Sequence, residues 1–415
     1  MLNIVLATAT PLHVEMGSYV FQDLAMCVNS TFCYANNWMT DYVAYGYFAE
    51  SADYNFGAFH LAANEALVVE FELPPETLYF GMTPYLLNRT SNGTNLELFA
   101  SLMDTVNMED ITARCGQDYA GSIRFIMSTN LYVTEKMSPS WHSCVIPFNI
   151  AGGLLNLGYD KTADWFGLLA RCTLFANAID GQIYLHEANT TVERVTLDVS
   201  TEYYGYPELD ARPDLLTETH LRPLLFELED AVLDTMKQAG YTWTDYNLEP
   251  FMANISYDSG WAGINNSVNL YGDNRDATYL NTPNSTDAWI LKPNDFILAI
   301  GVLHADVIKA TYNNIQIYDI VNWYGVTGFV NSQMEDTATT FLPEATSLYV
   351  LAFSRNCSAL PYEGRCASLT ETFPHGIPLD HGVFFVERVY SCPPNWRGPS
   401  YDSVVPAHMY HFSLR

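Results

Sequence analysis

The stretch Phe296-Ile-Leu-Ala-Ile-Gly-Val-Leu303 decides the fold class of this chain. It is a continuous apolar run with the length of one strand. A strand of this kind is buried on both faces. Three further segments after residue 250 also have strand composition: 315–320, 347–353 and 382–390. Short strands separated by Gly, Pro and Asn are typical of sandwiches and jelly rolls, not of strand–helix alternation.

The first 200 residues also favour strands. The segments 66–73, 122–127 and 191–199 show apolar and polar residues in alternation, and Pro74-Pro75 ends the first of them. One helix is expected at about 161–175, because Asp160 can cap it and its apolar residues cover one broad side. The pattern therefore predicts an N-terminal β-rich module over 1–200 with that helix inserted.

A connector and an amphipathic helix are expected at 201–249. Apolar residues recur at steps of three and four, which predicts a helix at about 219–239 that ends at Gly240: Leu221, Leu224, Leu225, Leu228, Val232 and Met236. A C-terminal β-sandwich module follows over 250–415. The predicted class is mainly β with helical insertions (α+β), as two β-sandwich or jelly-roll-like modules. No internal repeat of fixed period occurs.

The charge balance excludes several classes of partner. The 415 residues include 18 Lys and Arg against 47 Asp and Glu, a formal net charge of −29. Nucleic-acid binding and binding to acidic lipids both need clustered cations, so we expect neither. No run of 18 apolar residues occurs, and we therefore expect no transmembrane segment.

The eight cysteines indicate an oxidising compartment. None lies in a CxxC pair, which removes zinc-ribbon and thioredoxin interpretations. Cys27 with Cys33 and Cys357 with Cys366 enclose short turn-forming segments, so we predict two local disulfides. The even count suits four bridges in all, so we expect the other four cysteines to be paired as well, in a connectivity that the sequence does not determine: Cys115, Cys144, Cys172 and Cys392. A reduced cytosolic protein with buried thiols is the alternative.

Glycosylation sequons favour the secretory route together with the cysteines. Asn-x-Ser/Thr begins at eight asparagines: Asn29, Asn88, Asn92, Asn189, Asn254, Asn265, Asn284 and Asn356. We therefore expect N-linked glycans and an extracellular or lumenal location. The first ten residues are a short apolar run without a basic region, which fits a poor signal peptide, a truncated gene start or a first strand.

Two stretches resemble a known kind of protein. The segment from Leu67 to Met82 resembles a "strand, Pro, Arg-Tyr-Phe-Ser-Phe" segment of secreted bacterial and algal proteins built from tandem domains of unknown function. Gly301 to Tyr312 resembles a "Gly-Val-Asn-His-x-x-x-x-Lys-Ala-Thr-Tyr" segment in related sequences. Leu78, Gly81 and Leu303 depart from the patterns. The resemblance implies two β-sandwich modules with helical insertions, and no activity.

One turn could hold calcium. Gly272-Asp-Asn-Arg-Asp276 places the oxygens of Asp273, Asn274 and Asp276 within four residues, and oxygen ligands suit Ca²⁺. Such turns also form for conformational reasons alone, with side chains bonded to their own backbone. A polar contact through Arg275 is the third alternative.

Catalytic candidates gather in two segments. His304 and Asp306, two apart after a buried strand, would face the same side. Another segment adds His375, Asp380 and His381. If the two segments pair, these residues could hold Zn²⁺ or Mn²⁺. A hydrogen-bonding structural histidine is the alternative in each case. The cofactor prediction is thus Ca²⁺, a transition metal, or none.

Three functions remain open on the sequence. The first is a structural or interaction component of an extracellular or cell-surface assembly, with protein partners or self-assembly, because sequons and cysteines are present and the usual catalytic signatures are absent. The second is a secreted metal-dependent hydrolase or lyase acting on a neutral substrate such as a glycan. The third is a small-ligand carrier.

Overall fold

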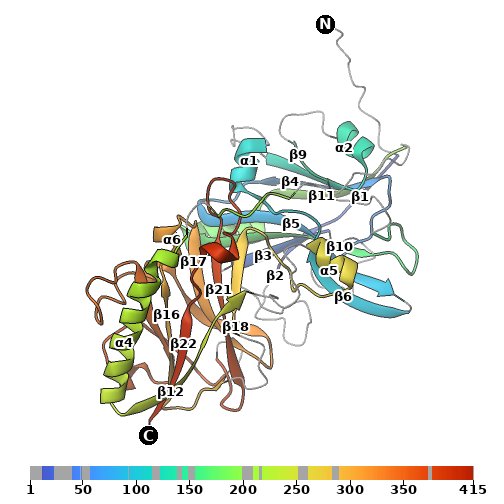
Figure 1. Cartoon of the computed structure of the whole chain (residues 1–415). Coiled ribbons are helices and arrows are strands. Elements are labelled where there is room, and N and C mark those ends of the chain that lie inside the picture. Colours follow the sequence, from blue (N-terminus) through green and yellow to red (C-terminus); the bar gives the residue numbers. More distant parts are fainter. Residues whose placement is uncertain are drawn as a thin grey trace. The chain divides into compact units, whose positions relative to one another are not determined.

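A computed structural model of the chain describes residues 12–22, 40–46, 48, 57–91, 93–114, 122–137, 143–147, 155–198, 209–214, 217–250, 260–282, 289–372 and 376–414. These residues fold mainly into antiparallel sheets with short helices between strands (Figure 1). The predicted mainly β class is therefore confirmed. None of the helices in these ranges is long and apolar enough to cross a membrane.

The chain forms two compact units. Of the described residues, unit 1 contains those up to Leu209 together with 260–275, and unit 2 contains 210–250 and 276–414. Residues 260–275 thus belong to unit 1, although they fall within the predicted C-terminal module. Each unit contains one five-stranded and one six-stranded sheet.

Unit 1 has a five-stranded sheet in the order β1-β11-β4-β8-β9. Its strands are β1 (His13–Met16), β11 (Thr190–Thr196), β4 (Glu65–Glu72), β8 (Ser122–Ser128) and β9 (Ser143–Pro147). All neighbours are antiparallel except β8 and β9, which are parallel. The helix α2 (Leu131–Met137) connects that parallel pair, as parallel strands require a crossover.

The second sheet of unit 1 has the order β2-β3-β10-β5-β6, with β7 beside β5. Its strands are β2 (Tyr19–Gln22), β3 (Thr40–Tyr45), β10 (Trp165–Phe175), β5 (Thr77–Ser91), β6 (Thr94–Ser101) and β7 (Val106–Asn107). The remaining helices of the unit are α1 (Met108–Arg114), α3 (Ala178–Glu187) and α5 (Gly260–Asn266).

Unit 2 repeats the arrangement. Its five-stranded sheet runs β12 (Tyr241–Asn247), β22 (His408–Leu414), β16 (Phe296–Val302), β19 (Leu348–Ser354) and β20 (Cys366–Ser368). Its six-stranded sheet runs β13 (Glu249–Pro250), β14 (Ala277–Asn281), β21 (Gly382–Tyr390), β17 (Tyr312–Asp319) and β18 (Tyr324–Val330), with β15 (Trp289–Ile290) beside β21. Its helices are α4 (Arg222–Gln238), α6 (His304–Val307) and α7 (Asn331–Met334).

The two units share one strand order. In each five-stranded sheet the first strand of the unit is at the edge, the last strand pairs with it, and a parallel pair closes the other side. The correspondence runs β1 to β12, β11 to β22, β4 to β16, β8 to β19 and β9 to β20. The architecture is therefore duplicated, although the sequence shows no repeat.

The continuous apolar run that begins at Phe296 forms β16, and all residues of this strand are buried. Phe296, Leu298, Ile300 and Val302 pack in one core cluster with the apolar side of α4, while the residues between them point to the other face. Figure 1 shows α4 lying along β16 and β22. Burial on both faces and the helix near 219–239 are confirmed.

The helix expected at about 161–175 is wrong. Those residues form β10, which pairs with β3 on one side and β5 on the other. A central strand carries apolar residues on both faces, and that continuous run imitates the broad apolar side of a helix. Gly167 argues against a helix here, because glycine destabilises a helix interior. In β10 its missing side chain leaves room for Leu87.

Residues 260–275 pack on β6 of unit 1. Backbone bonds join Leu270 N to Leu98 O at 2.9 Å and Gly272 N to Phe99 O at 2.8 Å. A Cβ at Gly260 would lie 1.7 Å from the carbonyl oxygen of Ser101, so only glycine permits this approach. The segment is an integral part of unit 1, and we call it the returning segment.

Candidate functional site

The expected His304–Asp306 pair is not formed. The strand ends at Val302, and His304 begins the one-turn helix α6. Two residues along a helix turn by about 200°, so the two side chains diverge. His304 is fully buried and Asp306 is exposed. The prediction that they share one face is therefore corrected.

His304 instead lies between two buried carboxylates of unit 2. Its Nδ1 is 2.6 Å from Glu218 Oε1, and its Nε2 is 3.1 Å from Glu387 Oε1. The three side chains are completely inaccessible to solvent. The Tyr349 hydroxyl donates to Glu387 Oε1 at 2.7 Å. We call these four residues the His304 network.

The remaining oxygens of this network are also bonded. The backbone amide of Val405 donates to Glu218 Oε2 at 2.8 Å, and that of Ala407 donates to Glu387 Oε2 at 3.1 Å. Every carboxylate oxygen therefore has a donor, as buried polar groups require. The bonds join the segment before α4, the start of α6, β19, β21 and the chain entering β22. The network fixes the core of unit 2.

Electrostatics holds His304 in its charged form. Burial opposes the charge, but Glu218 and Glu387 outweigh burial and raise the pKa of His304 to about 10. Both ring nitrogens of the imidazolium donate hydrogen bonds to carboxylates. It therefore has no free lone pair for a metal ion or for a proton from a substrate. We assign His304 a structural role.

The candidate catalytic residues of the second segment do not lie beside His304. His381 Nδ1 contacts Asp319 Oδ2 at 2.8 Å, and Asp380 is exposed. Six residues of extended chain separate His381 from Glu387, the partner of His304, or roughly 20 Å. His375 lies outside the described residues. Within the described ranges no group of three or more His, Cys, Asp or Glu side chains is placed to hold a metal ion.

The turn at Gly272 distributes its polar side chains among separate partners. Asp273 accepts from the amide of Ser101 at 2.7 Å and from its hydroxyl. Asn274 bonds Thr105 and Tyr79, both within unit 1. Asp276 belongs to unit 2 and pairs with Arg397 at 2.9 Å. The three predicted calcium ligands therefore do not converge.

The contacts of this turn agree with the third alternative, a polar contact through Arg275. Arg275 Nε lies 2.6 Å from Asp104 Oδ1, and both side chains are 7% exposed. Burial raises the pKa of Asp273, against the bonds from Ser101 and the charges of Arg171 and Arg275. The turn anchors the returning segment to unit 1.

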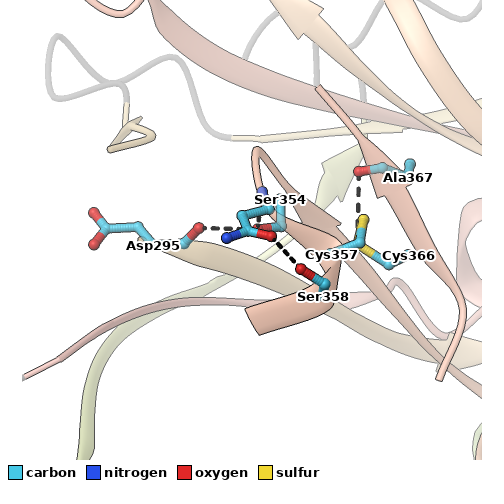
Figure 2. The surroundings of a disulfide bond; sticks show 7 residues. Asp295, Ser354, Cys357, Ser358, Cys366 and Ala367 are labelled. Atoms are coloured by element: carbon cyan, nitrogen blue, oxygen red, sulfur yellow. Dashed lines mark hydrogen bonds between the residues drawn. A yellow bond between two sulfur atoms is a disulfide. The ribbon is translucent and has the colours of Figure 1, made fainter. Parts of the chain in front are cut away.

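One predicted disulfide is present. Cys357 and Cys366 are bonded, with their Cα atoms 5.8 Å apart (Figure 2). The bond ties the 3₁₀ turn Cys357–Ala359 to β20, and Ser354 at the end of β19 donates to the Asp295 carbonyl nearby at 3.3 Å. The Ser358 hydroxyl donates to the Asn356 side chain at 2.7 Å.

The other cysteines divide into two groups. Cys172 and Cys392 are free and buried, so the expectation of a disulfide at each is corrected. Cys172 lies in the central strand β10, and burial raises the pKa of both thiols. Cys27, Cys33 and Cys115 fall outside the described residues, as does the side chain of Cys144 in β9.

The sequons differ in exposure. Asn189, Asn265 and Asn356 are exposed. Asn88 lies in β5 and is only 3% exposed, so the folded unit has no room for a glycan there. The predicted glycosylation of Asn88 is therefore corrected. Asn29, Asn92, Asn254 and Asn284 lie outside the described residues.

A second histidine network borders a pocket of about 290 Å³ in unit 2 and contributes His408 and Glu229 to its wall. His408 Nδ1 is 2.9 Å from Glu229 Oε1, and its Nε2 is 3.1 Å from Asp245 Oδ2. The Tyr410 hydroxyl also contacts Nδ1 at 2.9 Å. These four residues form the His408 network. The pocket is lined by Arg222, Leu225, Phe226, Glu229, Asn247, Val405, Pro406 and His408.

The His408 network is open to water. The His408 side chain is 15% exposed and Asp245 is 48% exposed. Burial lowers the pKa of His408, but Glu229 and Asp245 outweigh it, and the net shift is upward. The sequence carried one signal for this site, because positions 408 and 410 lie two apart on one strand and so share a face. The contact of His408 with Glu229 shows that this face is directed toward α4.

Comparison with known proteins adds one remote likeness. No family model matches the chain, and no curated protein sequence matches it either. Among solved structures it is similar to a crystal structure of an uncharacterized protein from Burkholderia cenocepacia. The two are 11% identical, with a TM-score of 0.45, over 99% of this chain and 84% of the other. A likeness this distant says nothing about activity.

An apolar surface strip lies on β1. Val14 and Met16 are 41% and 61% exposed, and they lie on the same face of the sheet. Leu12, which directly precedes the strand, is 65% exposed. Val14 pairs with Val195 of β11, which is buried in the core cluster on that face. Among the described strands, β1 is an edge strand that pairs with β11 alone. We call these residues the β1 strip.

Proposed function

We propose that the protein is a structural or interaction component of an extracellular or lumenal assembly, N-glycosylated and stabilised by disulfides. We further propose that each unit is a jelly-roll-like sandwich. The strand order supports this architecture. In a jelly roll a long antiparallel hairpin wraps so that early strands pair with late ones. In unit 2, β12 pairs with β22 and β14 with β21.

Unit 1 supports the same proposal, since β1 pairs with β11 and β3 with β10. Within each unit, a densely hydrogen-bonded sandwich makes a rigid framework. Rigid frameworks of this kind present surfaces to partners with little loss of conformational entropy on binding.

The β1 strip is the observation that carries the interaction role. Proteins normally blunt an edge strand with charge, proline or a covering segment, because its unpaired amides and carbonyls join other chains. Here Val14 and Met16 are exposed on β1, which pairs with β11 alone among the described strands, and Val14 lies opposite Val195 of a buried cluster. An exposed apolar patch on an open edge is a feature of protein–protein contact.

The bonding of the candidate histidines supports a non-catalytic role. His304 is enclosed, and His381 is held by Asp319. The metal-dependent hydrolase alternative draws no support from these residues, because their described members do not approach one another.

The pocket at His408 favours a second candidate function, a small-ligand carrier. Its volume of about 290 Å³ is near the lower end of small-molecule sites, and it combines apolar walls with a few polar groups. A thermal-shift screen of small acids, amines and neutral polyols would test this role. Stabilisation of wild type but not of a Phe226→Ala variant is expected for a true pocket ligand.

The secretory part is supported by the Cys357–Cys366 bond and by the exposed sequons at Asn189, Asn265 and Asn356. The test is expression in a secreting, glycosylating eukaryotic host followed by peptide mapping. We expect glycans on these three asparagines, no glycan on Asn88, and an oxidised Cys357–Cys366 pair. Bare asparagines with reduced thiols would remove the proposed location.

The assembly part needs a separate measurement. Light scattering across a concentration series, with and without calcium, should reveal self-association, and chemical cross-linking on the producing cells should capture any other partner. A strict monomer that captures no partner in either experiment would overturn the interaction role.

A further inference from the structure

We infer that the pocket beside His408 binds a small zwitterion. The carboxylate of the ligand lies at Arg222, its ammonium lies at Glu229, and an apolar body lies between the two charged groups. This inference rests on the proposed carrier role and names the chemical class of the ligand.

One wall of the pocket is a single face of α4. Four lining residues stand at positions i, i+3, i+4 and i+7 of this helix: Arg222, Leu225, Phe226 and Glu229. Residues with this spacing lie on the same face of a helix. Seven residues span about 10 Å of the helix axis, because each residue adds about 1.5 Å. The wall therefore presents a cation, an apolar stretch and an anion, in that order.

The rest of the wall comes from the end of β12 and from the chain that enters β22. Val405 and Pro406 add apolar surface, and Asn247 adds an amide that can donate or accept a hydrogen bond. The volume of about 290 Å³ equals that of roughly ten water molecules at about 30 Å³ each. A ligand with roughly ten non-hydrogen atoms therefore fills the pocket.

The Glu229 end of the pocket has an excess of negative charge. Glu229 and Asp245 lie 2.9 Å and 3.1 Å from the ring nitrogens of His408. Two carboxylates around one imidazolium leave one negative charge without compensation. The Glu229 side chain is only 8% exposed, and a carboxylate this buried favours a nearby cation. An ammonium suits this end, because it carries three hydrogen-bond donors and no acceptor.

The Arg222 end has the opposite charge. Arg222 is the first residue of α4 and is exposed. A guanidinium binds a carboxylate through two parallel hydrogen bonds, and the start of a helix also favours negative charge. The carboxylate of the ligand is therefore expected at this end.

The two ends together select against simpler ligands. An acid that fills the pocket brings its apolar end to Glu229, and an amine does the same to Arg222. Each leaves one charged end of the pocket without a partner. Specificity of this kind comes from the unpaired charge that a wrong ligand leaves behind.

Titration of the full chain with ε-aminocaproate tests this inference. This compound has an ammonium and a carboxylate at opposite ends of a short methylene chain. Hexanoate and hexylamine keep only one of the two groups, and each should bind about tenfold more weakly, because one charged pair is lost. The shorter γ-aminobutyrate should also bind more weakly, because it does not reach both ends of the pocket. Ligand-observed NMR measures weak binding of this kind.

A matched pair of variants locates the binding site on α4. Arg222→Gln should lower the affinity for ε-aminocaproate about tenfold and remove its advantage over hexylamine. Lys237→Gln removes a positive charge from the exposed last turn of the same helix and should leave the affinity unchanged. Both residues are exposed, so we expect both variants to fold, and thermal unfolding checks this.

Equal affinity for ε-aminocaproate and either singly charged compound, or equal losses in the two variants, would overturn the inference. If another compound of the thermal-shift screen still binds wild type but not Phe226→Ala, only the zwitterion inference fails. If no compound binds wild type in either experiment, the carrier role fails as well.

Discussion

His304 and His408 are chemically alike but differ in access to water. Each imidazole lies between two carboxylates and near a tyrosine hydroxyl within unit 2. His304 and its partners are fully inaccessible, whereas His408 forms part of a pocket wall. The comparison teaches that the same constellation is a structural tie when enclosed and a candidate binding feature when open. Burial, not residue type, decides the role.

Removing the enclosed imidazole should have the largest effect. A His304→Leu variant leaves Glu218 and Glu387 as uncompensated buried carboxylates, which destabilises by about 3–5 kcal/mol. Denaturant unfolding, with hydrogen exchange in β16 and β21 as a local measure, checks this. The triple variant His304→Leu, Glu218→Gln, Glu387→Gln should recover much of the loss. A triple variant no more stable than the single one would contradict the electrostatic explanation.

Alkaline pH should weaken the same network. The folded pKa of His304 is about 10 and its ordinary value is 6.5, so the folded state binds the extra proton. This stabilisation is complete below pH 6.5 and is lost as pH rises through 10. The free energy of unfolding against pH, measured for wild type and His304→Leu, checks the sign. Parallel curves for the two proteins between pH 7 and 10 would refute it.

The disulfide should contribute an amount of stability that lies between the contributions of the two histidine networks. Cys357 and Cys366 are nine residues apart, and closing so short a loop stabilises by about 2–3 kcal/mol in the chain-entropy account. A Cys357→Ser, Cys366→Ser variant should lose that amount in urea unfolding. The Ser358→Ala variant, which keeps the bond, is the matched control and should lose much less.

Removing the open imidazole should have the smallest effect on stability. In His408→Leu, water in the pocket can solvate Glu229 and Asp245, so we expect a loss of about 1–2 kcal/mol. The measurement is urea unfolding beside His304→Leu. Losses of equal size in the two variants would show that access to water does not separate the two networks.

The sequence allowed the prediction of local features. The apolar run of β16, the heptad-like spacing of α4 and the short Cys357–Cys366 loop are each encoded within a few residues. The helix at 161–175 failed because a central strand is apolar on both faces. Helical and doubly buried strand patterns cannot be separated over such a short run.

The His304 network was beyond the reach of sequence reasoning. Its two carboxylates lie 86 and 83 residues away from His304 along the chain, and only the tertiary fold of unit 2 brings them together. One signal was present. Glu387 and Arg388 interrupt an otherwise apolar strand, and buried charged groups demand partners. The duplicated strand order could not be predicted from the sequence, because the two units share a topology but not a repeated sequence.

The returning segment has a consequence for how the chain is made. Domains generally fold in the order in which the ribosome releases them. Unit 1 cannot follow that rule fully, because β6 waits for residues 260–275, which are translated after α4 and β12 of unit 2. The nascent chain must therefore hold an unfinished unit 1 while unit 2 has begun to form. A gene cut after residue 209 would release a product whose β6 never receives its neighbour.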